Sequence, residues 1–171
     1  MAMKINDIPP EGVTLKIDRM LDLFDNRTAS TPCTSVLSIK PMGGETFHIT
    51  GRVQADPVLE CSRCLKSFSS PVDAEFSIDL APAKVLGSDS EHELGQAELD
   101  TEFYQGDELD PVAIVKEQIL IAIPMVPLHH PDCKGLCPSC GKDLNEADCG
   151  CRKNSNGEFG SFAALRDLFN K

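Results

Sequence analysis

The sequence lacks a hydrophobic run long enough to cross a bilayer. Its longest apolar tract, Ile119 to Val126, is far shorter than the roughly 20 residues that a membrane-spanning helix needs. The chain also lacks the pattern of a secretory signal, because no charged start is followed by an apolar stretch and a small-residue cleavage site. We therefore expect a cytoplasmic protein without a membrane partner.

The motifs of several common enzyme classes are missing too. The sequence contains no GxxxxGK[ST] loop, GxGxxG turn or GxSxG elbow. A zinc deaminase needs an HxE element upstream of a PCxxC motif, and Glu91-His92-Glu93 does not have that spacing. A thioredoxin-like site needs a CxxC motif that opens a helix, whereas the chain after Cys64 passes through Pro71 into a predicted strand. We expect no enzymatic activity and no small-molecule substrate.

Lysine and arginine are absent between Val85 and Val115. Nine acidic residues, from Asp89 to Asp110, lie in this stretch, and the whole chain carries a formal net charge of −11. Such a segment repels a phosphate backbone, so we do not expect it to bind nucleic acid. Two interpretations stay open for the predicted acidic loop, residues 85–110: a solvated segment that keeps the protein soluble, or a docking site for a basic protein.

Alternating apolar and polar residues are the main structural signal that is present. The clearest case runs from Val72 to Leu80, and similar patterns predict strands over 13–17, 47–53 and 99–103. Asp110-Pro111 supplies an N-cap and a first-turn proline for a helix over 111–123, which Pro124 should end. A capping serine predicts a further helix over 161–169.

These patterns predict an α+β protein that is mainly β. We expect an antiparallel β body with two or three helices, followed by a C-terminal zinc knuckle. The predicted body covers residues 1–128 and includes the acidic loop and the helix. Residues 129–171 form the predicted cysteine-rich region with the terminal helix.

Eight cysteines are present, and five lie in the stretch CKGLCPSCGKDLNEADCGC, from Cys133 to Cys151. Without a secretory signal, such groups indicate metal-binding thiols rather than disulfides. A CxxC turn folds two thiolates to one side, and sulfurs about 3.7 Å apart suit a tetrahedral zinc ion. In Cys137-Pro-Ser-Cys140-Gly, Pro138 presets one backbone angle and Gly141 allows the positive φ that such a turn needs.

Seven cysteines remain as candidate ligands when Cys33 is set aside as an ordinary strand thiol. In one arrangement there are two zinc sites, and a histidine completes the second. Site A then consists of Cys137, Cys140, Cys149 and Cys151, and site B of Cys61, Cys64, Cys133 and His130, with His129 as the alternative to His130. In the competing arrangement a single zinc ribbon joins Cys61 and Cys64 to Cys137 and Cys140, and the remaining thiols are spares or belong to a weaker site.

Several motifs in this order resemble the bacterial YceD family, the large ribosomal RNA subunit accumulation proteins. They are Cys61-Ser-Arg-Cys64-Leu65, an acidic middle, Leu109-Asp110 before the helix, Pro124, and the run from Cys133 to Asn145. The resemblance covers the chain from about Gly51 onward. It implies a role in the synthesis, processing or stability of large-subunit ribosomal RNA, with no known catalytic activity.

The expected partners follow from this resemblance and from the charge. We expect association with ribosome assembly intermediates, with a basic ribosomal protein facing the acidic surface. Any RNA contact would come from Arg52, Arg63 and Lys66. A different hypothesis is a redox-sensing zinc protein with chaperone-like activity, in which an oxidant converts thiolates to disulfides and expels the metal.

Overall fold

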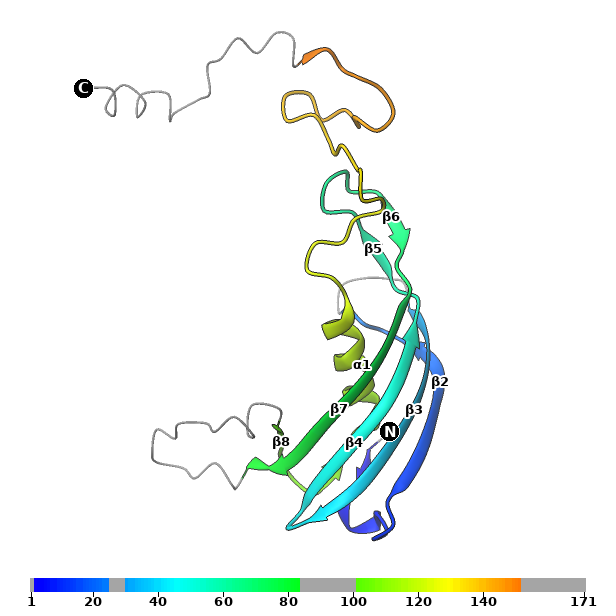
Figure 1. Cartoon of the computed structure of the whole chain (residues 1–171), viewed down its shortest axis with the longest axis vertical. Helices are drawn as coiled ribbons and strands as arrows, with labels where there is room; N and C mark the ends of the chain where they lie inside the picture. The colour runs from blue at the N-terminus through cyan, green and yellow to red at the C-terminus, as the bar shows by residue number, and fades with distance from the viewer. Residues whose placement is uncertain (1, 25–29, 84–100, 152–171) are drawn as a thin grey trace, which may run out of the picture. The chain divides into compact units, whose positions relative to one another are not determined.

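The computed structural model describes residues 2–24, 30–83 and 101–151 (Figure 1). The chain divides into two compact units. The first unit comprises residues 1–59 and 68–127, and the second comprises residues 60–67 and 128–171. The second unit therefore combines the loop that carries Cys61 and Cys64 with the cysteine-rich region.

A five-stranded sheet with the order β2-β3-β4-β7-β8 forms the first unit. Its strands are β2 (Val13–Leu21), β3 (Thr31–Gly43), β4 (Thr46–Ala55), β7 (Val72–Pro82) and β8 (Thr101–Tyr104). The first four strands pair antiparallel, whereas β8 runs parallel to β7. The expected antiparallel body is confirmed for the first four strands and is wrong at β8. The chain between Pro82 and Thr101 is long enough for the crossover that a parallel pair requires.

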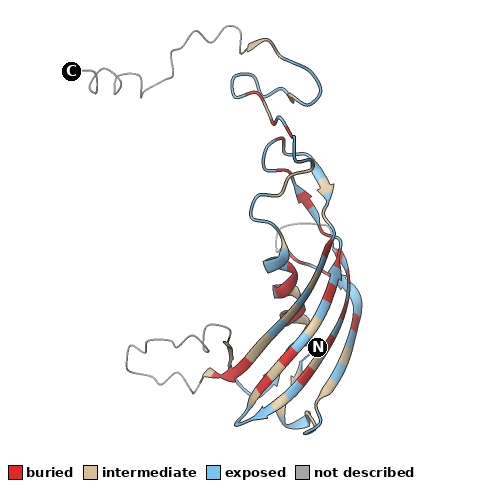
Figure 2. Cartoon of the chain, viewed as in Figure 1, coloured by how far each residue is buried: buried red, intermediate tan, exposed pale blue. Residues whose placement is uncertain are grey.

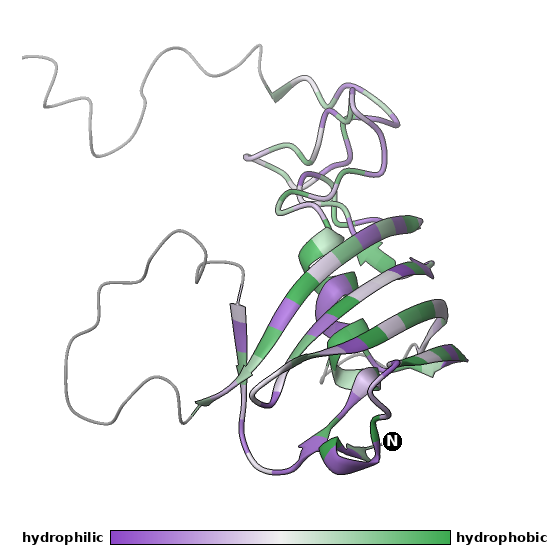
Figure 3. Ribbon diagram, turned by 60° about the horizontal axis from the view of Figure 1, so that its bottom comes forward, coloured by the Kyte–Doolittle hydropathy of each residue, from purple (hydrophilic) through white to green (hydrophobic). Residues whose placement is uncertain are grey.

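Strand alternation places one apolar face of the sheet against the core, because successive side chains point to opposite faces. Leu37 and Ile39 of β3, Ile49 and Val53 of β4, and Val115 of the helix are fully buried. Buried and exposed residues alternate along the strands in Figure 2, and hydropathy alternates with them in Figure 3. The strands predicted over 13–17, 47–53 and 72–80 are confirmed.

Gly51 interrupts the core-facing row of β4 for a steric reason. It lies opposite Leu37 of β3 and Phe76 of β7, and the Phe76 ring occupies the space above it. A Cβ atom at Gly51 would lie 2.7 Å from Cζ of Phe76 and 2.9 Å from the carbonyl oxygen of Val36. Glycine is therefore required here for close packing of the ring on the strand.

Helix α1 (Pro111–Ala122) covers the apolar face of the sheet (Figure 1). The Asp110 side chain accepts a hydrogen bond of 3.0 Å from the Val112 N–H, and Pro111 occupies the first turn, as the sequence predicted. Ile119 and Val115 point into the core. Pro124 follows the end of the helix, where its ring is incompatible with a further helical turn.

The described residues contain one α-helix rather than two or three. The helix predicted over 161–169 and most of the acidic loop lie outside the described ranges. The remaining elements are short: β1 (Met3–Lys4) pairs with β9 (Glu108–Leu109), β5 (Val58–Glu60) pairs with β6 (Ser67–Ser69), and η1 (Ile5–Asp7) is a single 3₁₀ turn. Between Leu128 and Cys151 turns predominate, as expected for a region held by thiol clusters.

Candidate metal centres

Two groups of side chains in the second unit are placed so that each could hold a metal ion. In each group the donor atoms all lie within 4.8 Å of one another. The two groups are Cys137, Cys140, Cys149 and Cys151, and Cys61, Cys64, His129 and Cys133. Cys33 belongs to neither group, since it is buried in β3 of the first unit.

The first group is formed by a turn and a short return of the chain. The Gly141 N–H donates to the Cys137 carbonyl at 2.8 Å and closes the CxxC turn, with Gly141 at φ +71°. Gly150, at φ +72°, separates the last two thiols, and its N–H donates to Asp148 Oδ1 at 3.0 Å. The positive φ that the sequence predicted at Gly141 is confirmed.

The thiols of the first group differ in acidity. Backbone N–H groups of Ser139 and Cys140 lower the pKa of Cys137 to about 6. The neighbouring thiols of Cys140 and Cys149 raise the pKa of Cys151 to about 12, because crowded sulfurs disfavour a further negative charge. A divalent cation removes this conflict, since it favours the thiolate at every sulfur that contacts it.

The second group lies where β5 ends. Its three cysteines are buried, and the sulfurs of Cys61 and Cys133 are 3.8 Å apart. Cys64 Sγ lies 3.3 Å from His129 Nδ1. Burial opposes ionisation of Cys61, yet hydrogen bonding to His129 lowers its pKa to about 5. Both separations suit donors around one tetrahedral zinc ion, for which sulfurs about 3.7 Å apart are expected.

The two CxxC turns have the same backbone construction. The N–H of Cys61 donates to the Lys66 carbonyl at 2.9 Å, and the N–H of Cys137 donates to the Lys142 carbonyl at 2.8 Å. The Leu65 N–H donates back to the Cys61 carbonyl at 2.9 Å. In the same way, the Gly141 N–H donates to the Cys137 carbonyl. Leu65 has φ +61°, a conformation that leucine rarely adopts.

The structure places His129, rather than His130, among the thiols of site B. The Nδ1 atom of His130 instead accepts a hydrogen bond of 3.2 Å from the Asp132 N–H. The Cys133 N–H donates to the His130 carbonyl at 3.1 Å, so His130 forms part of the turn that leads to Cys133. His130 as the fourth donor of site B is therefore corrected to His129, which the sequence also allowed.

The competing single ribbon is not what the structure forms. Cys61 and Cys64 lie in one group and Cys137 and Cys140 in the other, each with its own further donors. The grouping of the four thiols in site A matches the two-site arrangement.

Polar residues that follow the Cys137–Cys140 turn form hydrogen bonds that support Cys133, a thiol of the second group. Asn145 Nδ2 donates to Cys133 Sγ at 3.4 Å, and Asn145 Oδ1 accepts from the Lys134 N–H at 2.7 Å. Asp143 Oδ1 in turn accepts from Asn145 Nδ2 at 2.7 Å and from its backbone N–H at 2.8 Å. Lys66 Nζ lies 2.9 Å from Asp143 Oδ2 and lowers the pKa of that carboxyl to about 2. Sequence reasoning missed Asn145 and Asp143, whose only local signal is the Asp-x-Asn turn pattern.

Arg63 holds the two segments of the second unit together. Its Nη1 atom donates to the Cys133 carbonyl at 2.8 Å, and its own carbonyl accepts from the Leu136 N–H at 3.1 Å. A Cβ atom at Gly135 would lie 3.0 Å from the Arg63 carbonyl oxygen, so the chain passes close by at this point. Arg63 thereby positions the backbone that carries Cys133.

The basic residues considered for an RNA contact all have protein partners. Arg52, in the first unit, makes two hydrogen bonds of 2.7 Å to the Asp73 carboxylate. In the second unit Lys66 pairs with Asp143 and Arg63 binds backbone carbonyls. These contacts stabilise the fold. Because the three cations are already paired within the protein, less of their charge is available to a phosphate backbone. No helix within the described ranges is long and apolar enough to span a membrane.

Comparisons with known proteins place both thiol groups inside a matched region. The family model described as large ribosomal RNA subunit accumulation protein YceD matches residues 49–169. A protein of that name from Haemophilus influenzae is 30% identical over 114 residues, which cover 67% of this chain and 62% of that protein.

Mycobacterial relatives are similar to a shorter part of the chain. An uncharacterized protein of Mycobacterium tuberculosis strain H37Rv is 31% identical over 106 residues, which cover 58% of this chain and 46% of that protein. An uncharacterized protein of Mycobacterium bovis matches to the same extent. The chain thus spans less than two thirds of the length of these relatives. No solved structure matches.

Proposed function

The chain belongs to the YceD family of large ribosomal RNA subunit accumulation proteins, and on that premise we propose that it is a non-catalytic accessory factor in ribosome biogenesis. Its role is to support the synthesis, processing or stability of large-subunit ribosomal RNA in the bacterial cytoplasm. The observation that carries this proposal is the family match over residues 49–169, which includes most of β4, all of β5 to β9, helix α1 and both thiol groups.

Zinc is the metal that we propose for both groups. Thiolate-rich sets with an imidazole are typical of zinc, and four protein donors around a tetrahedral ion leave no open position for a substrate. Structural zinc in small domains contributes roughly 10 to 16 kcal/mol, which is comparable with the whole stability of a domain, about 5 to 15 kcal/mol. The metal would therefore hold the second unit in shape rather than carry out a reaction.

A basic protein is the direct partner that fits the charge best. The chain has 27 acidic and 16 basic residues. On β7 the exposed carboxylates of Asp73 and Glu75 add little to this excess, because Arg52 lies 2.7 Å from Asp73 and 3.7 Å from Glu75. The acidic stretch from Asp89 to Asp110 adds negative charge and contains no lysine or arginine. Such a segment attracts the lysine-rich and arginine-rich proteins that must be delivered to ribosomal RNA, and it repels the RNA itself.

Sedimentation of cell extracts tests this proposal. The protein should co-sediment with precursors of the large subunit, and not with those of the small subunit, in gradients run at low magnesium. The double variant Cys61→Ser/Cys137→Ser should lose this association, whereas Cys33→Ala, which changes a thiol outside both groups, should retain it. Sedimentation only as free protein in wild-type cells would contradict the proposal. The comparisons lend no support to the redox-sensing alternative.

A further inference from the structure

Strand β2 forms an open edge of the five-stranded sheet. It pairs along its whole length, Val13–Leu21, with β3, and its other edge has no strand partner in the described part of the chain. Figure 1 shows β2 as the outermost strand on its side of the sheet. The N–H and C=O groups along such an edge are a ready template for another strand.

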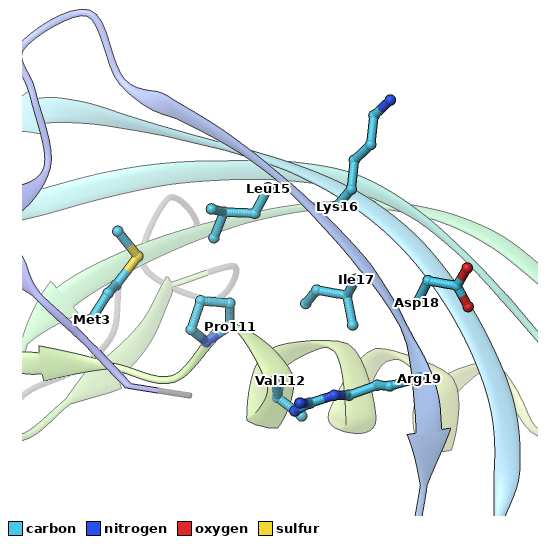
Figure 4. A pocket seen from close by; sticks show the side chains of 8 residues that line it. All are labelled: Met3, Leu15, Lys16, Ile17, Asp18, Arg19, Pro111 and Val112. Atoms are coloured by element: carbon cyan, nitrogen blue, oxygen red, sulfur yellow. The ribbon is translucent and has the colours of Figure 1, made fainter.

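An apolar cavity lies beneath this edge. It has a volume of about 410 Å³ and lies between β2 and the start of helix α1. Its apolar wall comes from Met3, Leu15, Ile17, Pro111 and Val112, and the charged residues Lys16, Asp18 and Arg19 of β2 complete the lining. In Figure 4, Leu15 and Ile17 lie on the side of Pro111 and Val112, whereas Lys16 points away from the helix. A strand added to β2 would cover this wall and bury apolar surface that the described residues of one chain leave open.

The outward-facing row of β2 carries a charge pattern that is complementary to itself. This row contains Thr14, Lys16, Asp18 and Met20, all exposed. Ile17 is the middle residue of β2. When two copies of β2 pair antiparallel about Ile17, Lys16 of each copy lies directly opposite Asp18 of the other. Opposite charges at directly paired positions stabilise an antiparallel pair.

Neighbouring registers are disfavoured by the same two residues. A shift by one residue would turn the apolar row of one copy to the outer face, so only shifts by two need to be considered. The nearest such registers place Lys16 opposite Lys16 or Asp18 opposite Asp18, and like charges in these positions repel. The register centred on Ile17 also pairs the strand from end to end, with Val13 opposite Leu21.

We propose that this protein forms a symmetric dimer through the β2 edge, with two copies of β2 antiparallel about Ile17. The two sheets then join into one continuous sheet, which removes an exposed edge from each copy. The Ile17 side chain and the aliphatic part of the Arg19 side chain from one copy cover the cavity wall of the other copy. This assembly concerns the first unit alone and does not depend on the proposed role in ribosome biogenesis.

Analytical ultracentrifugation of the full chain over a dilution series tests the dimer. At about 0.15 M salt the wild-type protein should show a concentration-dependent monomer–dimer equilibrium. Lys16→Asp and Asp18→Lys each place like charges opposite one another at two symmetric positions, so each should raise the dissociation constant about tenfold or more. The double variant Lys16→Asp/Asp18→Lys exchanges the two charges and should restore dimerisation. Lys40→Asp makes the same charge change on the exposed face of β3, away from the edge, and should have little effect.

Three results would overturn the proposal. The first is a wild-type protein that stays monomeric at every concentration. The second is a dimer that the two single variants do not weaken. The third is a double variant that dimerises no better than the single ones. Circular dichroism melting curves establish that each variant is folded, which is expected because Lys16 and Asp18 are exposed.

Discussion

Leu65 and Gly141 occupy equivalent positions in two CxxC turns with the same hydrogen bonds. Both residues have positive φ, +61° for Leu65 and +71° for Gly141. Glycine adopts this conformation without steric cost, whereas a side chain brings a penalty of about 1 to 2 kcal/mol. Leu65 is also 64% exposed, so little packing compensates for that cost. The turn that carries Cys61 and Cys64 is therefore the more strained of the two.

Exchanging these residue types should weaken zinc binding at site A but not at site B. Gly141→Leu should weaken zinc binding at site A about tenfold, because it introduces a penalty of at least 1 kcal/mol into the metal-bound turn. Leu65→Gly should leave zinc binding at site B unchanged or tighten it. Competition with a chromophoric chelator measures both. A weaker site B in Leu65→Gly would mean that the leucine side chain makes a contact that outweighs its backbone strain.

Asn145 should matter for site B although it follows the turn of site A in sequence. Its side chain donates to Cys133 Sγ and is itself held by Asp143. Loss of such a supporting hydrogen bond typically costs 10-fold to 100-fold in metal affinity. We expect Asn145→Ala to lower zinc affinity by about that factor at site B, measured by cobalt substitution and its thiolate charge-transfer absorption. Asn6→Ala, an exposed change in the first unit, is the control, and equal affinities in the two variants would contradict the assignment.

Asp73 should titrate at unusually low pH. Two hydrogen bonds from Arg52, with a third from Gln54, lower the pKa of Asp73 from 3.8 to about 2. Because the folded-state pKa is the lower one, the stabilising contribution is complete above about pH 4 and is lost as the pH falls towards 2. Carbon-13 NMR of the carboxyl group follows this titration directly. Arg52→Met should return the pKa of Asp73 towards 3.8, whereas Lys40→Met should leave it low.

Gly51 should be intolerant of even the smallest side chain. In Gly51→Ala the new methyl group meets the Phe76 ring and the Val36 carbonyl, and overpacking of this kind costs about 1 to 3 kcal/mol. Urea unfolding of the first unit measures the loss. Adding Phe76→Leu should recover part of it by removing the ring, while Thr50→Ala on the opposite face should change little. A Gly51→Ala variant as stable as the wild-type protein would show that the Phe76 ring can move aside.

Local sequence signals predicted the elements whose determinants are close together in the chain. The alternation from Val72 to Leu80, the Asp110 cap and the positive φ of Gly141 each depend on a few adjacent residues, and each is confirmed. The assignment of four thiols to site A also rested on spacing alone, and the structure brings those thiols together.

The features that the sequence did not reveal depend on distant parts of the chain. His129 and His130 are neighbours with the same donor atoms, so spacing cannot tell which ring turns towards Cys64. The residues of β8 themselves do not indicate whether the strand pairs parallel or antiparallel with β7. Leucine gives no signal of positive φ, and the bond from Asn145 to Cys133 joins residues that only the folded turn brings together.

The most direct test of the ribosomal role is the ratio of large-subunit to small-subunit ribosomal RNA in the source organism after depletion of this protein. We expect a selective fall in large-subunit RNA. Wild-type protein and Cys33→Ala should restore the ratio, whereas Cys137→Ser should not, because it removes a thiol of site A. An unchanged ratio after complete depletion would contradict the proposed function.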